Sequence, residues 1–187
     1  MISCVRCGRS CKRADVKTVD GEPVCVPCLY GDVKPVVMYP IGTVVNDRQR
    51  RARGFGTRSP TDSKISEIRL NPGLASLMGG LADEKHLVIV WQLHQSRGVE
   101  TVFSRGWDHK KVGPFASRTP DRLTPIAITE VELVGVEGTV LRVRGLDAIN
   151  GTPVLDIKMS IGSKRRGREG KGSSPCSPKV PPKVPPS

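Results

Sequence analysis

Two short cysteine pairs near the start of the chain constrain its folding more than any other feature. Cys4-Val5-Arg6-Cys7 and Cys25-Val26-Pro27-Cys28 both have CxxC spacing, with 17 residues between Cys7 and Cys25. Each pair can present two thiolates to one tetrahedral ion, and this spacing is typical of a zinc ribbon. Gly8 leaves room for a tight backbone turn behind the sulfurs. The sequence therefore predicts a structural Zn²⁺ bound by Cys4, Cys7, Cys25 and Cys28.

Alternatives for this cysteine segment stay open at the level of sequence. The cysteines could form two disulfides, although disulfides are rare in cytoplasmic proteins. Cys11 could replace Cys7 as a ligand or be a spare thiol. A ribbon beside a basic domain could hold nucleic acid, or it could only pack against that domain.

Apolar patterning argues against a membrane protein. The longest apolar run, Leu87 to Leu93, has the length of a strand and is interrupted by Gln92, so it is too short to span a bilayer. Two cysteines and two arginines within the first nine residues are foreign to a signal peptide. We therefore expect a cytoplasmic protein with no membrane partner.

The net charge of +12 is distributed unevenly along the chain. Residues 164–187 carry seven Lys or Arg and one acidic residue, which is half of the excess. A basic protein tends to bind polyanions, of which nucleic acid is the commonest; the plainer alternative is a basic tail that only aids solubility. The Ser- and Pro-rich tail cannot bury enough apolar area to offset its ordering entropy, so we expect disorder there, with Cys176 an idle thiol.

The chain divides into three predicted segments: a zinc-ribbon module at 1–34, a mainly β body at 35–162 and the basic Pro-rich tail at 163–187. Apolar alternation and turn residues in the body predict strands, at 36–45, 64–70, 87–95, 126–136 and 139–143. The last two form a hairpin through Glu137-Gly138. One short helix is predicted from Pro72 to Gly79, with Asn71 as its N-cap. Strands separated by turns predict a small single β-barrel, and no Gly-rich Rossmann fingerprint is present.

The segment from Gly145 to Lys158 carries more polar groups than a hydrophobic strand needs. Asn150-Gly151 is a strong signal for a tight turn, because both residues tolerate positive φ. A short strand is predicted to follow from Thr152 to Ile157. The remaining polar residues, Asp147, Asp156 and Lys158, indicate a site at the ends of strands.

Four separated motifs resemble one enzyme family. The segment 145–158 is similar to the motif LDxxDGTPVLDIK, 115–126 resembles FATRSPxRPNPI, 86–95 resembles HLWxLFxxHQ, and Pro40-Ile41-Gly42 matches an opening PIG. In the right order, over about residues 38–160, these motifs resemble the TsaA-like (TrmO) family of tRNA N6-adenine methyltransferases.

This resemblance implies a compact β-barrel that binds S-adenosylmethionine and acts as a homodimer. It implies methylation of N6 of a threonylcarbamoylated adenosine beside the tRNA anticodon, so that the anticodon stem-loop is the partner. The cofactor contacts implied by the resemblance fall on His94, Gln95, Arg118, Ile128, Leu146, Asp147, Ala148 and Ile149.

Two side chains are candidates for the catalytic base that removes the N6 proton. His94 ends an apolar strand where it opens toward solvent, and Asp156 lies near the end of another. Asp156 can equally cap a turn and pair with Lys158. Asp147 can accept hydrogen bonds from ribose hydroxyls or simply form the turn, and Arg118 can bind a carboxylate bidentately or be a solvated loop residue. His86, eight residues before His94, is expected to be a core histidine bonded to the backbone.

Arginine-rich segments are the candidate RNA contacts. The loop from Asn46 to Arg58 has the composition of a phosphate-binding loop, or of a mobile surface loop. Phe55 or Trp107 could stack on an unstacked base, although both are more typical of packing residues. The predicted RNA-contacting residues are Arg48, Arg50, Arg51, Arg53, Arg122 and Lys158.

The chain departs from the family pattern at two places. The family's RPNP is Arg122-Leu123-Thr124-Pro125 here, and its DIKPY is the segment from Asp156 to Ser160. A tyrosine can stack on a base, whereas serine cannot. These departures favour two alternatives: a methyltransferase of the same fold acting on another RNA base or a small molecule, or a non-catalytic RNA-binding zinc-ribbon protein.

Overall fold

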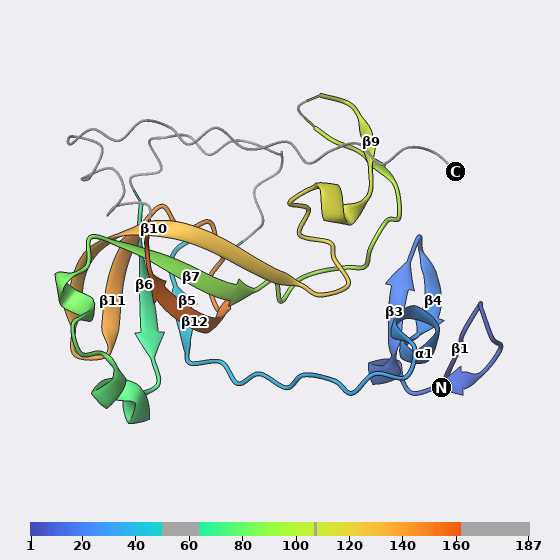
Figure 1. Ribbon diagram of the computed structural model, residues 1–187, viewed down its shortest axis with the longest axis horizontal. Coiled ribbons are helices and arrows are strands. Elements are labelled where there is room, and N and C mark those ends of the chain that lie inside the picture. The colour runs from blue at the N-terminus through green and yellow to red at the C-terminus, as the bar shows by residue number, and fades with distance from the viewer. Residues whose placement is uncertain (50–63, 107, 162–187) are drawn as a thin grey trace, which may run out of the picture.

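The computed structural model describes residues 1–49, 64–106 and 108–161 (Figure 1). Several predicted features fall outside these residues. They are the basic tail from residue 163 with Cys176, the arginines Arg50, Arg51, Arg53 and Arg58, and the aromatic residues Phe55 and Trp107.

The cysteine module, residues 1–31, is built from two small hairpins and one helix. Strands β1 (Ile2–Ser3) and β2 (Ser10–Cys11) pair antiparallel, as do β3 (Val16–Val19) and β4 (Glu22–Cys25). A 3₁₀ turn, η1 (Arg13–Asp15), precedes β3, and the helix α1 (Val26–Tyr30) follows β4 directly. Cys4, Val19, Val24 and Cys25 are buried together and form a small core separate from that of the barrel.

Six strands of the body form a closed antiparallel barrel, so the predicted fold class is confirmed. In spatial order the strands are β10 (Ile126–Glu137), β11 (Val140–Arg144), β6 (Ile65–Leu70), β5 (Gly42–Val45), β12 (Pro153–Met159) and β7 (His86–Gln92). The hairpin of β10 and β11 was predicted with nearly these bounds. Closure leaves no unpaired sheet edge in the barrel.

Alternation of side chains along the strands fills the barrel. In β7, Leu87, Ile89 and Trp91 are buried, whereas their neighbours in sequence are half-buried on the outer wall. Because side chains of a strand point alternately to its two faces, these residues form one inward row. The same core is completed from the neighbouring strands by Ile68, Leu141, Val143 and Val154, whose side chains are fully buried.

Two predicted elements that precede β7 in the chain differ from the structure. Of the predicted strand at 36–45 only β5 forms, because pairing with β6 and β12 begins at Gly42 and residues 36–40 are exposed. Gly42 is needed there, since a Cβ would lie 2.5 Å from the Arg69 carbonyl oxygen. The predicted helix after Asn71 is a 3₁₀ helix, η2 (Pro72–Leu77), and the Asn71 amide donates to Pro40 O instead of capping it.

The segment between β7 and β10 is a long excursion from the barrel. It contains β8 (Phe103–Ser104), β9 (Lys111–Val112) and the 3₁₀ turn η4 (Pro114–Ala116). A further 3₁₀ turn, η3 (Leu81–Asp83), precedes β7. Among the helices of the described ranges, none is long and apolar enough to cross a membrane.

Candidate functional site

Loops from all six barrel strands meet at one end of the barrel, called here the rim. β7 ends at Gln92 beside Ile126, where β10 begins, and Trp91 pairs with Val154 at the start of β12. β11 ends at Arg144 opposite Ile65 of β6. Since neighbouring strands are antiparallel, the rim collects residues 46–49, 93–97 and 145–152. Among the predicted site residues, this brings Arg48, His94, Gln95 and the 146–149 segment to the same end.

The 145–152 loop is fixed by backbone hydrogen bonds and by burial of alternate side chains. Leu146, Ala148 and Ile149 are buried, whereas Asp147 between them is exposed. Because their side chains are enclosed, the three apolar residues can offer a ligand only backbone groups. The predicted turn is present: Thr152 N donates to Ile149 O at 3.2 Å, and Gly151 has a φ of 77°.

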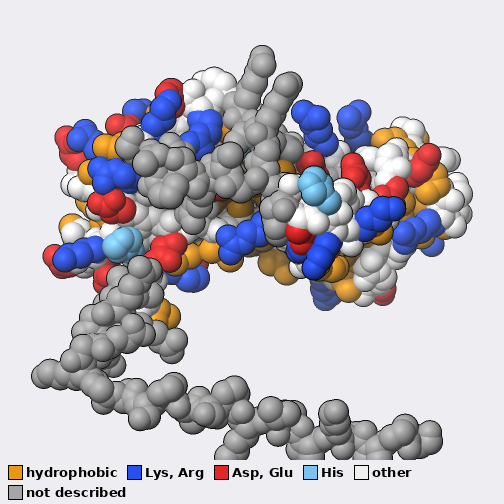
Figure 2. Space-filling model, turned by 90° about the horizontal axis from the view of Figure 1, so that it is seen from above, with side chains coloured by type: hydrophobic (Ala, Val, Ile, Leu, Met, Phe, Trp, Pro, Cys, Tyr) orange, Lys and Arg blue, Asp and Glu red, His pale blue; other side chains and the backbone are white. Residues whose placement is uncertain are grey.

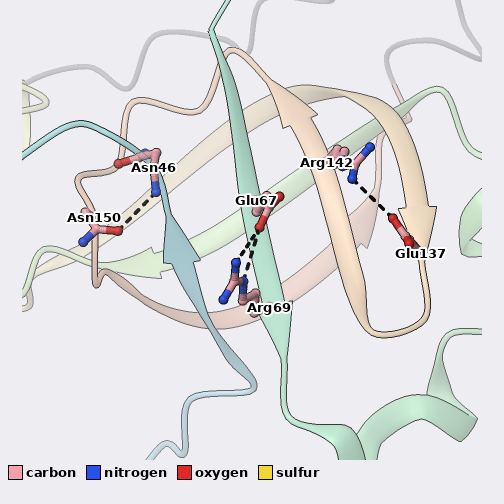
Figure 3. Close-up of polar contacts among 6 residues, drawn as sticks. All are labelled: Asn46, Glu67, Arg69, Glu137, Arg142 and Asn150. Atoms are coloured by element: carbon pink, nitrogen blue, oxygen red, sulfur yellow. Dashed lines mark hydrogen bonds and ion pairs between the residues drawn. The ribbon is translucent and has the colours of Figure 1, made fainter.

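Asn46 joins the end of β5 to this loop. Its side-chain amide donates to Ala148 O and to Ser66 Oγ, each at 3.0 Å. Its backbone N–H donates to Asn150 Oδ1 at 3.1 Å, the contact drawn in Figure 3. Asn46 was not a predicted site residue. Its position directly after a strand and beside an arginine-rich segment was the available signal.

A hydrogen-bonded chain holds the Asp147 side chain. The indole Nε1 of Trp91 donates to Thr129 Oγ1 at 3.2 Å, and that hydroxyl donates to Asp147 Oδ1 at 2.8 Å. Trp91 and Thr129 are both buried, so these two hydrogen bonds fix an exposed carboxylate against the rigid barrel core. Sequence reasoning missed both supporting residues, although a tryptophan inside an apolar strand requires an acceptor for its N–H.

His94 lies beyond the end of its strand. The predicted strand to Gln95 stops at Gln92, and Ser96 N donates to Leu93 O in a turn that exposes His94 and Gln95. The ring atom Nδ1 lies 3.3 Å from Oγ1 of buried Thr152. The predicted strand at 87–95 is therefore too long, and His94 does not lie on the strand that contains His86. His86 is also not a backbone-bonded core histidine, because its buried Nδ1 has no partner in the structure.

Asp156 and Lys158 lie on the outer wall of β12. Their side chains form an ion pair with each other and are 47% and 65% exposed. Asp156 Oδ1 also accepts from Ile157 N at 2.9 Å. Residues 152 and 156 are separated along the strand by roughly 13 Å, so the structure does not bring Asp156 to the His94–Thr152 contact.

The remaining predicted residues are dispersed. Ile128 is 63% exposed on the outer wall of β10, opposite Val90. Arg118 is exposed in the long excursion. Arg122 is half-buried, and its Nη1 donates to Pro114 O and Ser117 O at 3.0 Å each, so part of this guanidinium fixes the excursion itself.

The four cysteines predicted to bind metal converge in the cysteine module. Their Sγ atoms all lie within 4.8 Å of one another, and Cys7 Sγ is 3.8 Å from Cys25 Sγ. A Zn–S bond of about 2.3 Å gives a tetrahedron with edges of about 3.8 Å, so the spacing fits the ion. The cysteines that the structure describes are all free, so it contains no disulfide among them. Cys11 Sγ instead donates to Arg9 O at 3.6 Å.

The backbone of the module favours thiolates at this point. Cys25 N donates to Cys4 Sγ at 3.3 Å, and Gly8, at a φ of 70°, donates its N–H to Cys4 O. Backbone hydrogen bonds, from Cys25 first and then Arg6 and Cys7, lower the pKa of Cys4 to about 6 against the opposing effect of burial. Side-chain hydrogen bonds with Cys25 and Cys7, together with burial, raise the pKa of Cys28 to about 12. A cation bound among the sulfurs would stabilise the thiolate of Cys28 and so lower its pKa.

Comparisons with known proteins agree with this architecture. Residues 50–162 match the family described as tRNA-methyltransferase O N-terminal domain, a range that begins after the Pro40-Ile41-Gly42 motif. A probable S-adenosyl-L-methionine-binding protein of Methanothermobacter thermautotrophicus is 40% identical over 111 residues, which is 56% of this chain and 80% of that protein. A tRNA (adenine(37)-N6)-methyltransferase of Rattus norvegicus is 36% identical over 52% of this chain and 23% of its own length.

A solved structure shares the fold. The crystal structure of TrmO from Pseudomonas aeruginosa superposes with a TM-score of 0.55 and 25% identity over 70% of this chain. The chain spans 58% of that solved chain.

Proposed function

The chain belongs to the tRNA-methyltransferase O N-terminal domain family, and we propose on this basis that it is an S-adenosylmethionine-dependent methyltransferase. Its proposed substrate is tRNA, and the proposed target is N6 of the adenosine beside the anticodon in its threonylcarbamoylated form. One relative is named as a probable S-adenosylmethionine-binding protein, which supports the proposed methyl donor. Another is named as a tRNA adenine N6-methyltransferase, which supports the proposed methyl acceptor.

One observation supports a donor-binding site at the rim: the series of hydrogen bonds from Trp91 through Thr129 to Asp147. It holds an exposed carboxylate in place at the rim, and a fixed carboxylate is suited to two ribose hydroxyls or to an ammonium group. The backbone of residues 146–149 and the exposed His94 and Gln95 supply further polar groups nearby in the fold. We assign Arg118 and Ile128 to the same role from the family motif; their positions on the excursion and the outer wall require a ligand that reaches beyond the rim.

Methyl transfer makes modest chemical demands on the protein. When bound, S-adenosylmethionine supplies an electrophilic methyl carbon on a sulfonium. The protein aligns the acceptor in line with that carbon and takes up the N6 proton. An exocyclic amine is a weak nucleophile because its lone pair is delocalised, and an adjacent threonylcarbamoyl carbonyl makes its N–H more acidic.

We propose His94 as the group that takes up this proton. In this role Nδ1 carries the hydrogen and donates it to Thr152 Oγ1, 3.3 Å away, so Nε2 keeps a free lone pair. Asp156 remains the second candidate. Its ion pair with Lys158 and its place on the outer wall favour a role in surface structure or RNA contact.

RNA contacts complete the proposal. Arg48 at the rim, Arg122 in the excursion and Lys158 on β12 are the proposed contacts within the described residues, and Arg50, Arg51 and Arg53 belong to the same proposal from sequence. The anticodon stem-loop is the proposed anionic partner. Assembly as a homodimer, which the family resemblance implies, and a cytoplasmic location, expected from the apolar patterning, are part of the proposal.

We further propose that Cys4, Cys7, Cys25 and Cys28 hold a structural Zn²⁺. The 3.8 Å separation of two sulfurs and the backbone donors to Cys4 support it. All four positions of the tetrahedron are taken by thiolates, so the ion has no open position for catalysis. The division into module 1–34, barrel 35–162 and tail 163–187 is proposed with it.

A change of acceptor is the second candidate function. The chain departs from the family pattern at two segments, Arg122-Leu123-Thr124-Pro125 and Asp156 to Ser160. Ser160, which stands where the family has a tyrosine, is buried, and its hydroxyl donates to Glu130 Oε1 at 2.6 Å. Ser160 is thus committed to internal structure and offers no stacking surface, which favours another RNA base or a small molecule as acceptor.

Nucleoside analysis separates these candidates. Digested tRNA from a strain lacking this gene, analysed by mass spectrometry, is expected to lose the methylated threonylcarbamoyladenosine. An unchanged nucleoside profile, together with intact donor binding by calorimetry, would favour the other acceptor. Absence of donor binding would favour the non-catalytic alternative.

A further inference from the structure

A cavity of about 250 Å³ lies between the cysteine module and the rim. Its module wall is Val16 to Thr18 of β3, and its opposite wall is the turn after β7, including His94 and Arg97. Arg122 and Leu123 close it from the end of the excursion. One boundary of the candidate active site is therefore made by a part of the chain that the family match does not include.

The two walls are held together by a continuous set of hydrogen bonds. Val19 and Val99 form a parallel bridge, in which Val99 N donates to Thr18 O at 3.0 Å and Asp20 N to Val99 O at 2.8 Å. The Asp20 carboxylate accepts from Thr101 N and Thr101 Oγ1, both at 2.7 Å. Contact is so close that a Cβ on Gly98 would lie 3.1 Å from Thr18.

This junction depends on the folded cysteine module. Val19 and Val99 are buried in the same small core as Cys4 and Cys25. The arrangement of the four cysteines therefore fixes the position of β3. Because β3 is hydrogen-bonded to the segment after β7, it also fixes the turn that carries His94. The module is joined to the rim and is not an independent appendage.

The cavity walls carry an excess of positive charge. Lys17, Arg97 and Arg122 all line it, and His94 lies beside them. Across residues 1–49, 64–106 and 108–161, the ammonium of Lys17 and the guanidinium of Arg97 have no ion pair with an acidic side chain. Asp121 Oδ1 accepts from the backbone N–H of Arg97 at 3.1 Å. Arg122 donates to neutral carbonyls, which leave its charge uncompensated.

Arginines on the barrel wall behave differently. Figure 3 shows Arg69 paired with Glu67 and Arg142 with Glu137, and Arg144 pairs with Glu132 at 2.7 Å. Figure 2 likewise shows blue basic and red acidic side chains interspersed over the visible face. The cavity is thus a local site where cations gather without carboxylate partners, as an anion-binding site requires.

We propose that this cavity binds a backbone phosphate of the RNA substrate, with Lys17, Arg97 and Arg122 as its cations. The inference rests on the proposed function and extends it, because it makes the cysteine module part of the substrate site. S-adenosylmethionine carries a sulfonium and an ammonium against one carboxylate, so three cations would repel it. A phosphate is attracted, and His94 on the same wall then lies close to the nucleotide that the phosphate belongs to.

The test compares two double variants of the full zinc-loaded chain. K17A/R97A removes two cavity cations, and the matched control K12A/K85A removes two exposed lysines away from the cavity. Binding of a fluorescein-labelled anticodon stem-loop RNA is measured by anisotropy over a range of salt concentrations. K17A/R97A is expected to weaken binding roughly tenfold at low salt and to reduce the slope of log affinity against log salt by about 0.7–0.9, the value for one lost phosphate contact. The control is expected to change the slope by less than about 0.5.

Calorimetric measurement of S-adenosylmethionine binding distinguishes a phosphate site from a donor site in this cavity. The proposal predicts an unchanged S-adenosylmethionine affinity in K17A/R97A. Equal RNA binding by the two variants, or loss of donor binding with RNA binding retained, would overturn it, the second result assigning the cavity to the donor. A wild-type protein that binds RNA through these cations but binds no donor would refute the proposed function and leave the phosphate site standing.

Discussion

The imidazole of His94 and the hydroxyl of Thr152 lie 3.3 Å apart, although 58 residues separate them in sequence. The contact joins the turn after β7 to the residue before β12, and Thr152 is fully buried. A buried hydroxyl is a fixed partner, so it sets the orientation of an otherwise exposed ring. This is how the proposed base is held at the rim.

Removing that hydroxyl tests the role of His94. Thr152→Val keeps the side-chain volume but frees the ring, so we expect single-turnover methyl transfer to slow by about tenfold to a hundredfold. Donor affinity is expected to stay within about twofold, because the change affects proton transfer. Thr152→Ser retains the hydroxyl and serves as the control. Equal rates in the Val and Ser variants would remove the contact from the mechanism.

Asp156→Asn distinguishes the second candidate base. Because Asp156 pairs with Lys158 on the outer wall, we expect turnover to fall by less than about threefold, whereas His94→Asn should cost at least about a hundredfold. Both rates are measured at saturating donor and RNA. A severe defect in Asp156→Asn with normal donor binding would transfer the catalytic role to Asp156.

The chain from Trp91 to Asp147 gives a prediction with two readouts. Thr129→Val leaves the buried Trp91 N–H without an acceptor, which should lower the free energy of unfolding by about 1–3 kcal/mol. It also releases the Asp147 carboxylate, so donor affinity should fall by about tenfold. Chemical denaturation and calorimetry measure the two effects, with Thr129→Ser as the matched control. A destabilised variant with normal donor affinity would separate Asp147 from the donor site.

Sequence reasoning predicted the barrel well for a physical reason. Apolar and polar residues alternate in β6, β7 and β10, which indicates strands with one buried face. Gly151 indicates a tight turn, because few other residue types adopt its backbone conformation. The same reasoning extended β5 back to Val36, because a β-rich composition does not reveal where a partner strand begins. The end of β7 at Gln92 was missed likewise. The contacts of Thr129, Asn46 and Asp20 depend on tertiary placement, which no local pattern encodes.

Zinc content is expected to be one ion per chain, and its loss should lower thermal stability. Cys4→Ser removes a buried ligand with backbone donors and should abolish stoichiometric zinc, measured by elemental analysis. Cys11→Ser should retain it, because Cys11 lies outside the four converging sulfurs. Full zinc occupancy in Cys4→Ser, or loss in both variants, would contradict the assigned ligand set.

The junction of module and rim should respond to pH. Hydrogen bonds from the Thr101 backbone and hydroxyl lower the pKa of Asp20. The unfolded state therefore binds this proton more readily, so the stabilisation is complete above the ordinary Asp pKa of about 3.9 and is lost as pH falls through the lower folded-state pKa. The difference in Tm between wild type and Asp20→Asn should be largest near pH 6 and should shrink below about pH 4. A difference that stays constant over this range would refute the linkage.

Methyl transfer itself is tested most directly with tRNA purified from a strain lacking this gene. The zinc-loaded protein is incubated with that tRNA and S-adenosylmethionine bearing a deuterated methyl group, and the digested nucleosides are analysed by mass spectrometry. Wild-type protein is expected to place one deuterated methyl on N6 of threonylcarbamoyladenosine, and His94→Asn almost none. Label on another nucleoside, or no label although the protein is folded and binds the donor, would refute the proposed methyl transfer.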